Sequence, residues 1–195
     1  MGGNDVKKTL LCLLCGALLC GCGGERAVDV QEQYRAVTTA SMEAEVVSRV
    51  STGDRAYTLT CDYDPDGQSV TTVTSPEELA GLTAVLAGGE MAVRSGDVLL
   101  PAGLSADVCP ANCLPYLMAS LAEGYRTEEC RETWEDTDCL RLTLDTTGKD
   151  GDRVSCAVWL DGETLIPRYA EFTQREQVVL TVKMLSFTCT TEPEE

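Results

Sequence analysis

The chain has 195 residues, of which 32 are acidic and 15 are basic, and its formal charge at pH 7 is −17. Such a surface repels nucleic-acid phosphates and anionic lipid headgroups, which disfavours nucleic-acid binding and electrostatic docking on a membrane. Solubility explains the acidic excess, and a cationic partner is the alternative. Because the chain has no histidine, histidine-dependent triads, Cys–His nucleophile pairs and mixed Cys–His zinc sites are excluded.

The N-terminus has the layout of an export signal. Lys7 and Lys8 precede an uncharged apolar run at residues 10–19, which is shorter than the about 20 residues that a spanning helix needs. Residues 1–21 are therefore predicted to be a signal peptide that is removed on export. The remainder suits one domain with its own core. Its formal charge is −18, because two lysines and one aspartate leave with the signal.

The residues from Leu19 to Cys22 resemble the bacterial lipobox, in which a cysteine that follows a small residue receives diacylglycerol. Cys22 follows Gly21, whereas the earlier cysteines follow bulky leucines. The resemblance implies a Gram-positive lipoprotein with diacylglycerol and palmitate on Cys22, anchored to the outer face of the cell membrane. An ordinary secretory signal is the alternative. Residues 22–26 are then a lipidated tether, which keeps the domain within roughly 15 Å of the headgroups.

Apolar periodicity in the first part of the mature chain predicts a helix and then three strands, at residues 27–36, 41–50, 56–63 and 68–74. Residues 64–67 favour a hairpin turn, because Pro65 presets one backbone angle and Gly67 tolerates positive φ. Residues 62–67 also match the opening of a calcium loop. The twelfth position of that loop is Val73 instead of Glu, so the turn is preferred and no metal is expected.

The next stretch has strong helix signals. Ser75 can cap a helix, Pro76 suits its first position, Glu78 can complete a capping box, and Gly88 with Gly89 can end it. The sequence therefore predicts a helix over residues 76–87, with an apolar stripe at Leu79, Leu82 and Leu86.

Two short strands and a second helix follow, at residues 91–93, 98–100 and 113–123. Asn112 can cap that helix and Gly124 can close it. Five further strands are expected, at residues 125–134, 138–146, 152–160, 168–174 and 178–189. Asp161 and Gly162 form a two-residue turn signal, and residues 190–195 are predicted to be a disordered acidic tail.

Together these elements predict one domain over residues 27–189. It is an antiparallel sheet of seven to nine strands, and the helices at 76–87 and 113–123 cover its apolar face.

Seven cysteines follow the predicted anchor: Cys61, Cys109, Cys113, Cys130, Cys139, Cys156 and Cys189. Export permits disulfides, but an odd number leaves at least one thiol, and all can stay reduced in an organism that lives without oxygen. Cys130 with Cys139 and Cys109 with Cys113 are the candidate disulfides. Three residues separate the second pair, which is one too many for the redox motif of thioredoxins, so packed thiols or a structural bridge are preferred to redox catalysis.

Several short sequence segments, in this order and spacing, resemble those of Gram-positive lipoproteins with the fold of LolA, the outer-membrane lipoprotein carrier. They are residues 57–60, 64–65, 75–81, 114–117, 166–172 and 185–187. The resemblance implies an α+β fold, a curved antiparallel β half-barrel covered by two or three helices, whose concave side holds acyl chains in the carriers. Relatives include mycobacterial lipid-carrying lipoproteins and clostridial spore-germination lipoproteins. The resemblance implies that the latter group works through protein partners. A lipid-anchored chain does not inherit the carrier's shuttling.

The leading functional hypothesis is a non-enzymatic binding module without a cofactor, which holds acyl chains or a hydrophobic segment inside the half-barrel. The candidate lining residues share apolar character on facing stripes, and they are Leu59, Leu82, Leu117, Leu121, Leu142 and Val158. Packed core is the alternative for all six.

Two other functions compete with lipid binding. The first is an interaction lipoprotein that recruits or stabilises an envelope or spore-cortex protein, which an exposed apolar patch on a sheet edge would favour. The second is a cell-wall hydrolase, for which Glu128 with Glu129 and Glu132 with Asp136 are the candidate carboxylate pairs. In so acidic a chain these pairs are better explained as a solvated face, so no enzyme activity is expected.

Overall fold

The computed structural model describes residues 24–50, 53–104, 108–147 and 153–192. The predicted signal peptide at 1–21 and the predicted lipid attachment at Cys22 lie outside these ranges, and both stay predictions. Within them, no helix is both long and apolar enough to cross a membrane.

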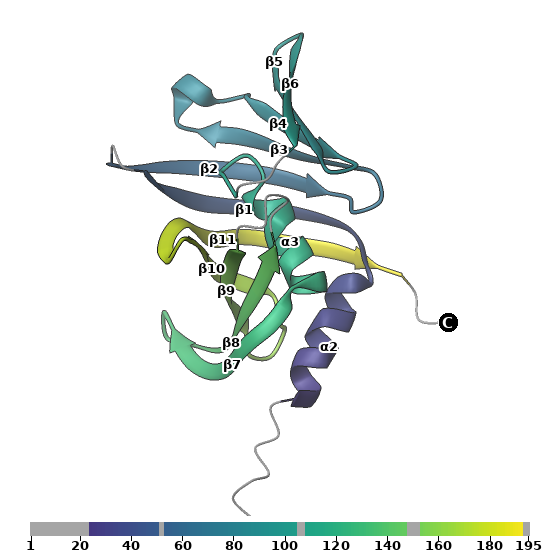
Figure 1. Ribbon diagram of the computed structural model, residues 1–195, viewed down its shortest axis with the longest axis vertical. Helices are drawn as coiled ribbons and strands as arrows, with labels where there is room; N and C mark the ends of the chain where they lie inside the picture. Colours follow the sequence, from purple (N-terminus) through teal and green to yellow (C-terminus); the bar gives the residue numbers. More distant parts are fainter. Residues whose placement is uncertain (1–23, 51–52, 105–107, 148–152, 193–195) are drawn as a thin grey trace, which may run out of the picture.

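The described chain contains few helices and many strands (Figure 1). The helices are α2 (Gly24–Arg35), the short 3-10 helix η1 (Glu77–Leu79) and α3 (Cys113–Glu123). The strands before α3 are β1 (Val37–Val50), β2 (Gly53–Tyr63), β3 (Gln68–Ser75), β4 (Thr83–Ala87), β5 (Glu90–Ser95) and β6 (Val98–Leu104). Those after it are β7 (Tyr125–Trp134), β8 (Thr137–Thr147), β9 (Arg153–Asp161), β10 (Pro167–Gln174) and β11 (Gln177–Thr191).

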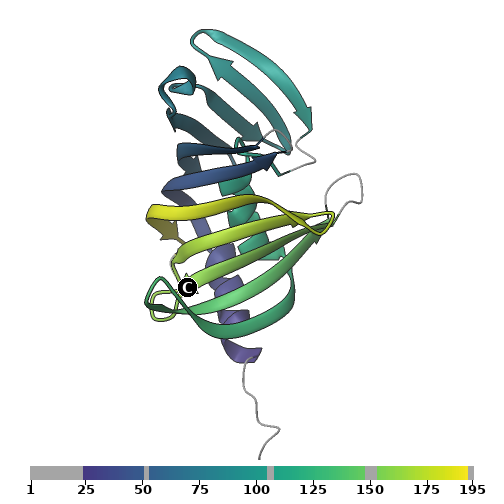
Figure 2. The same ribbon diagram turned by 90° about the vertical axis from the view of Figure 1, so that its left-hand side faces the viewer.

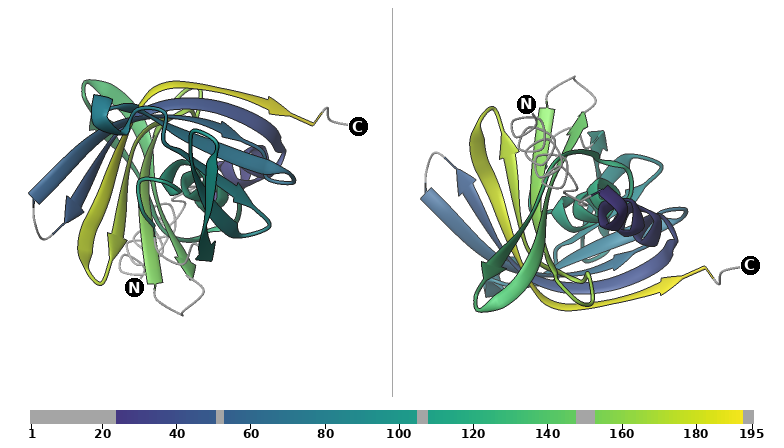
Figure 3. Two further views of the ribbon diagram at one scale, coloured as in Figure 1. Left: turned by 90° about the horizontal axis from the view of Figure 1, so that it is seen from above. Right: turned by 90° about the horizontal axis from the view of Figure 1, so that it is seen from below.

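All of these strands form one antiparallel sheet, in the order β6-β5-β4-β3-β2-β1-β11-β10-β9-β8-β7. Strands that are neighbours in the sequence pair with each other within each half, and the pairing of β1 with β11 joins the two halves. Val46, for example, lies opposite both Tyr57 of β2 and Val182 of β11. The sheet curves around α2 and α3 (Figures 2 and 3). The predicted half-barrel is therefore confirmed as an architecture.

Alternation along the strands explains which face is buried. In β9, Val154, Cys156, Val158 and Leu160 are fully buried on the concave face, as the period of two requires. The helix α3 packs its own apolar stripe against this face, with Leu114, Leu117 and Leu121 at 0% exposure. Each such side chain contributes about 1.5–3 kcal/mol of burial free energy, so the centre of the half-barrel is a packed core.

The predicted helix over 76–87 is wrong. Only residues 77–79 make a helical turn, Gly81 then takes a left-handed φ of +86°, and residues 83–87 form β4 between β3 and β5. Gly88 and Gly89, with φ of +56° and +79°, make the tight turn of the β4–β5 hairpin, where residues of positive φ are required. The pairing of β4 with strands on both sides outweighs the local helix signals. The two helices that cover the sheet are therefore α2 and α3, and not a helix at 76–87.

Several boundaries also differ from the predictions. Helix α2 begins at Gly24, inside the predicted tether, and β1 begins at Val37 instead of residue 41. Thr190 and Thr191, assigned to the disordered tail, belong to β11 and pair with β1, and the N–H of Glu192 donates to the carbonyl of Ala36. Backbone pairing with β1 therefore extends order into the tail. Residues 193–195 lie outside the described ranges.

Neither candidate disulfide is formed among the described cysteines. Cys130 lies opposite Arg141, while Cys139 lies opposite Glu132. The two cysteines are thus diagonal neighbours, and that offset of about 7–8 Å exceeds what a disulfide spans without backbone movement. The thiol of Cys113 is fully buried at the start of α3, 3.5 Å from the carbonyl oxygen of Pro110.

The convex face carries an aromatic cluster, defined as Trp134, Trp159 and Tyr169. The ring of Trp134, at the tip of the β7–β8 hairpin, stacks on Tyr169 with centroids 5.1 Å apart and planes at 13°. Trp159 lies 5.3 Å from Tyr169. Arg141 and Lys183 sit over the rings of Trp159 and Trp134, a favourable arrangement for cations. The hairpin tip is therefore folded back across two strands.

Candidate ligand-binding groove

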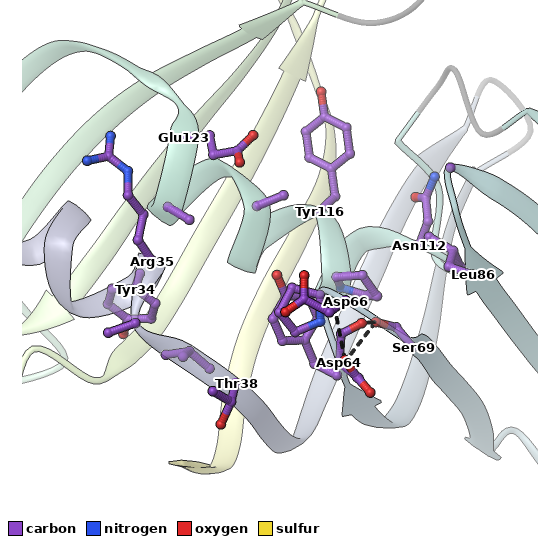
Figure 4. A pocket seen from close by; sticks show the side chains of 18 of the residues that line it. Tyr34, Arg35, Thr38, Asp64, Asp66, Ser69, Leu86, Asn112, Tyr116 and Glu123 are labelled. Carbon is purple, nitrogen blue, oxygen red and sulfur yellow. Dashed lines mark hydrogen bonds between the residues drawn. The ribbon is translucent and has the colours of Figure 1, made fainter. Parts of the chain in front are cut away.

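A groove of about 530 Å³ opens at the end of the half-barrel where β1 begins and β11 ends. Three parts of the chain line it: one face of α3, the junction of α2 with β1, and the turn between β2 and β3 (Figure 4). A fourth contribution, Leu86 with Gly89, comes from β4 and the turn after it.

The floor of the groove is the outer face of α3. Pro115, Tyr116, Ala119, Ala122 and Glu123 line it, at the spacing that places residues on one side of a helix. The opposite side of α3 holds the buried leucines of the core. Because Ala119 and Ala122 are small, the floor leaves space that a larger side chain would fill.

The β2–β3 turn forms one wall. The carboxylate of Asp64 accepts the backbone N–H groups of Asp66 and Gly67, at 3.1 and 2.8 Å, which is an Asx-turn. The backbone N–H of Asp64 donates to the hydroxyl of Ser69, which in turn donates to the Asp64 carbonyl. The preferred turn interpretation of this segment is therefore confirmed, and one oxygen of Asp64 is used within it.

The junction of α2 with β1 forms the other wall. Tyr34 is buried at the end of α2, and its hydroxyl donates to the carbonyl of Leu165 at 2.8 Å. Its neighbours Arg35 and Thr38 also line the groove, together with Glu192, which follows β11. One turn earlier, Gln31 donates to the Gly124 carbonyl at 2.7 Å. This wall is thus fixed to the rest of the fold by long-range hydrogen bonds.

Negative charge and neutral phenols dominate the lining. Asp64, Asp66, Glu123 and Glu192 face a single cation, Arg35, among the described lining residues. Burial, followed by the carboxylates of Glu123 and Asp66, raises the pKa of Tyr63. Burial also raises the pKa of Tyr34 and of Tyr116. The three phenols therefore stay protonated at neutral pH, and the groove disfavours anionic groups.

The predicted lining residues lie elsewhere. Leu59, Leu117, Leu121, Leu142 and Val158 are at most 1% exposed and belong to one packed cluster. Leu82 is half-buried beside β4, where its carbonyl accepts the N–H of Val73 at 2.9 Å. None of the six lines the groove. Apolar spacing identified the core correctly, but it could not distinguish core from cavity wall, because both are made of the same residue types.

The glutamates of the candidate carboxylate pairs are bound to arginine or indole donors. Glu128 is bound to Arg141 at 3.3 Å, whereas Glu129 is bound to Arg126 at 3.0 Å. Glu132 accepts the indole N–H of Trp159. Glu128 and Glu129 therefore bind different arginines, while Arg141 also lies 3.9 Å from Glu132. In the described ranges, no group of three or more Cys, Asp or Glu side chains is placed to hold a metal.

Sequence reasoning did not assign the groove residues to a binding site. The Asp64 wall was interpreted as a turn, and the floor as part of the predicted helix over residues 113–123. A usable signal was present, since Ala119 and Ala122 are small residues on one side of that helix, next to Tyr116. The contribution of Glu192 was not recognisable, because the residue had been assigned to a disordered tail.

No protein family model and no curated protein matches the chain. Solved structures do. A domain from Vibrio parahaemolyticus described as an outer membrane lipoprotein-sorting protein is 10% identical, with a TM-score of 0.52 over 87% of this chain and 93% of that one. A DUF1329 family protein from Desulfovibrio piger is 12% identical, with a TM-score of 0.51 over 86% and 92%.

A LolA superfamily protein from Nitrosomonas europaea is 14% identical, with a TM-score of 0.46 over 86% of this chain and 94% of that one. At such identities the matches concern the fold alone. The chain therefore resembles the Vibrio parahaemolyticus domain in fold.

Proposed function

We propose that the chain is a lipid-anchored, extracytoplasmic binding protein without enzymatic activity, and that its groove holds an acyl chain or a hydrophobic segment of an amphipathic ligand. The observation that carries the proposal is the groove itself, about 530 Å³ with an alanine floor and phenol walls, which has the size of a small-molecule site. The likeness to a lipoprotein-sorting domain supports a ligand of this class.

The charge of the lining narrows the ligand further. Four carboxylates and one guanidinium surround the opening, so an anionic headgroup would be repelled at close range. Tyr63 lines the groove, where its ring can contact methylene groups and its hydroxyl can donate to an ester or hydroxyl oxygen. A zwitterionic or uncharged headgroup therefore fits better than phosphatidylglycerol.

The position of the groove agrees with an anchor at Cys22. Helix α2 begins two residues after Cys22 and ends at the groove, where Tyr34 and Arg35 lie. At about 1.5 Å per residue, the groove at the end of α2 lies roughly 16 Å from the start of this helix. A domain anchored this way would present the groove close to the lipids of the same membrane.

Filling the groove tests the proposal. Ala119 is exposed on the floor, so Ala119→Trp occupies the space without disturbing the core. In native mass spectrometry of delipidated mature protein, we expect a one-to-one adduct with dioleoyl phosphatidylcholine, less with dioleoyl phosphatidylglycerol, and at least tenfold less of either in A119W.

Ala80→Trp is the matched control, because Ala80 is exposed and lies outside the groove. It should bind lipid as the unmodified protein does. The absence of any lipid adduct, or equal adducts in A119W and A80W, would refute ligand binding in the groove.

A further inference from the structure

Strand β6 forms one edge of the sheet and exposes large apolar side chains. Val98, Leu99 and Leu100 are 55%, 52% and 61% exposed, and they are three of the six exposed large hydrophobic residues in the described chain. They are consecutive, so both faces of the edge strand are apolar. Contiguous exposed apolar surface of this kind marks an interaction site.

The concave face of the sheet loses its cover toward this edge. One cross-strand row runs from β2 to β6 through Cys61, Thr71, Ala84, Val93 and Leu100. The first three side chains are at most 5% exposed, Val93 is half-buried, and Leu100 is 61% exposed. The mostly apolar row therefore continues past the point where the helices cover it.

The two edges of the sheet differ in how they resist strand addition. The other edge, β7, carries charged residues along its length, namely Arg126, Glu128, Glu129, Arg131 and Glu132. Charges on an edge strand are a common protection against pairing with another chain. Strand β6, with the sequence Val-Leu-Leu-Pro-Ala-Gly-Leu, has none. One edge is therefore protected by charge, and the other is open.

The position of β6 argues against a membrane as its occupant. The β5–β6 hairpin and the start of α2 lie at opposite ends of the long axis of the molecule (Figures 1 and 2). Because the predicted anchor precedes α2 by two residues, a chain anchored there presents β6 away from the bilayer. This step depends on the anchor in the proposed function, but not on ligand binding in the groove.

Charge argues against a second copy and for a basic partner. Two chains that each carry a formal charge of −17 repel each other, while the same charge attracts a basic segment and increases its association rate.

Pro101 has no N–H to donate, which limits continuous pairing to the stretch around Leu99.

We propose that β6 is a strand-addition site, at which a short extended segment of a protein partner, apolar at its centre and basic at its flanks, adds a further strand to the sheet. Main-chain hydrogen bonds to the open edge would supply much of the affinity, and contacts with Leu99 and Leu100 on the two faces would set the register.

A designed peptide tests this proposal directly. The probe has alternating Val and Thr between two pairs of Lys, and its binding to the full mature chain is measured by fluorescence anisotropy. We expect Leu99→Lys to weaken binding by about tenfold or more, because the substitution removes an apolar contact and adds a repelling charge. Leu185→Lys changes a leucine on β11 of similar exposure, 48% against 52% for Leu99, and should leave the affinity unchanged.

Further measurements separate strand addition from other binding modes. A peptide with N-methyl groups on alternate amides keeps its side chains but cannot pair, so it should not bind. Hydrogen exchange at residues 98–100 should slow when the unmodified peptide is added. Equal binding of the methylated peptide, equal affinity of L99K, or exchange protection that rises with protein concentration alone would overturn the proposal, the last by showing a second copy on β6. Unchanged peptide affinity in A119W would show that this site is independent of the groove.

Discussion

Asp161 organises the loop between β9 and β10 through its carboxylate. One oxygen accepts the N–H groups of Glu163 and Thr164 and the hydroxyl of Thr164, and the other accepts from Arg168 at 2.9 Å. These donors hold the pKa of Asp161 well below its usual range, the backbone bond from Thr164 being the largest cause. Asp161 and Gly162 had predicted a two-residue turn, but the carboxylate stabilises a longer loop instead.

Replacing Asp161 with Asn should therefore lower stability in a pH-dependent way. A carboxyl whose pKa is depressed by folding stabilises the folded state above its unfolded pKa of about 4, and this stabilisation is lost as the pH falls through the folded value. We expect D161N to lose about 1–3 kcal/mol of unfolding free energy at pH 7 and less below about pH 3. Urea titrations at both pH values measure this.

Asp97→Asn serves as the control, because Asp97 is exposed in the β5–β6 turn. It should change the free energy of unfolding by less than about 0.5 kcal/mol. A D161N deficit that is the same at both pH values would contradict the role of the charged carboxylate.

At the scale of the element, periodicity predicted most strands and α3, because apolar residues alternate in the predicted strands over 138–146 and 152–160 and repeat at helical spacing over 113–123. It failed at 76–87, where leucines three and four residues apart fit a helix. Gly81 is unfavourable inside a helix, and Thr83 and Val85 suit a strand. The pairing of β4 on both sides is long-range, so no local signal could reveal it.

The sequence predicted strands β7 and β8 but not the folding back of their hairpin tip, and the stability of this arrangement can be tested. Trp134 stacks on Tyr169 and lies 5.5 Å from Lys183, which also binds Glu135 at 2.8 Å. We expect Trp134→Ala to lower the free energy of unfolding by about 1–3 kcal/mol, measured by urea denaturation with circular dichroism. Tyr125→Ala is the matched control, since Tyr125 is also on β7 but 76% exposed. Equal effects of W134A and Y125A would show that the stacking does not stabilise the hairpin.

At the scale of the molecule, the pairing of β1 with β11 joins the two halves of the sheet into one curved layer. Two separate candidate binding regions, the groove and the open edge, lie on this layer. The groove lies at the end of α2, beside the residues that begin β1, whereas the open edge β6 is farthest from the β1–β11 pairing in strand order. The core residues could be predicted from apolar spacing. The groove could not be predicted, because it forms where α3 lies next to the β2–β3 turn. These two segments are about fifty residues apart in sequence.

The acidic surface as a whole predicts a dependence of stability on salt. With a formal charge of −17 and few cations to pair, the folded chain repels itself, and this repulsion acts over about 30 Å at 0.01 M ionic strength but about 8 Å at 0.15 M. We expect the free energy of unfolding to rise by about 1 kcal/mol or more between these conditions. Neutralising two exposed acids in Glu77→Gln with Glu78→Gln should raise stability at low salt and reduce the salt dependence. If urea midpoints stay constant across the salt series, the acids contribute to solubility without strain, and the repulsion that we invoke against a second copy on β6 loses its support.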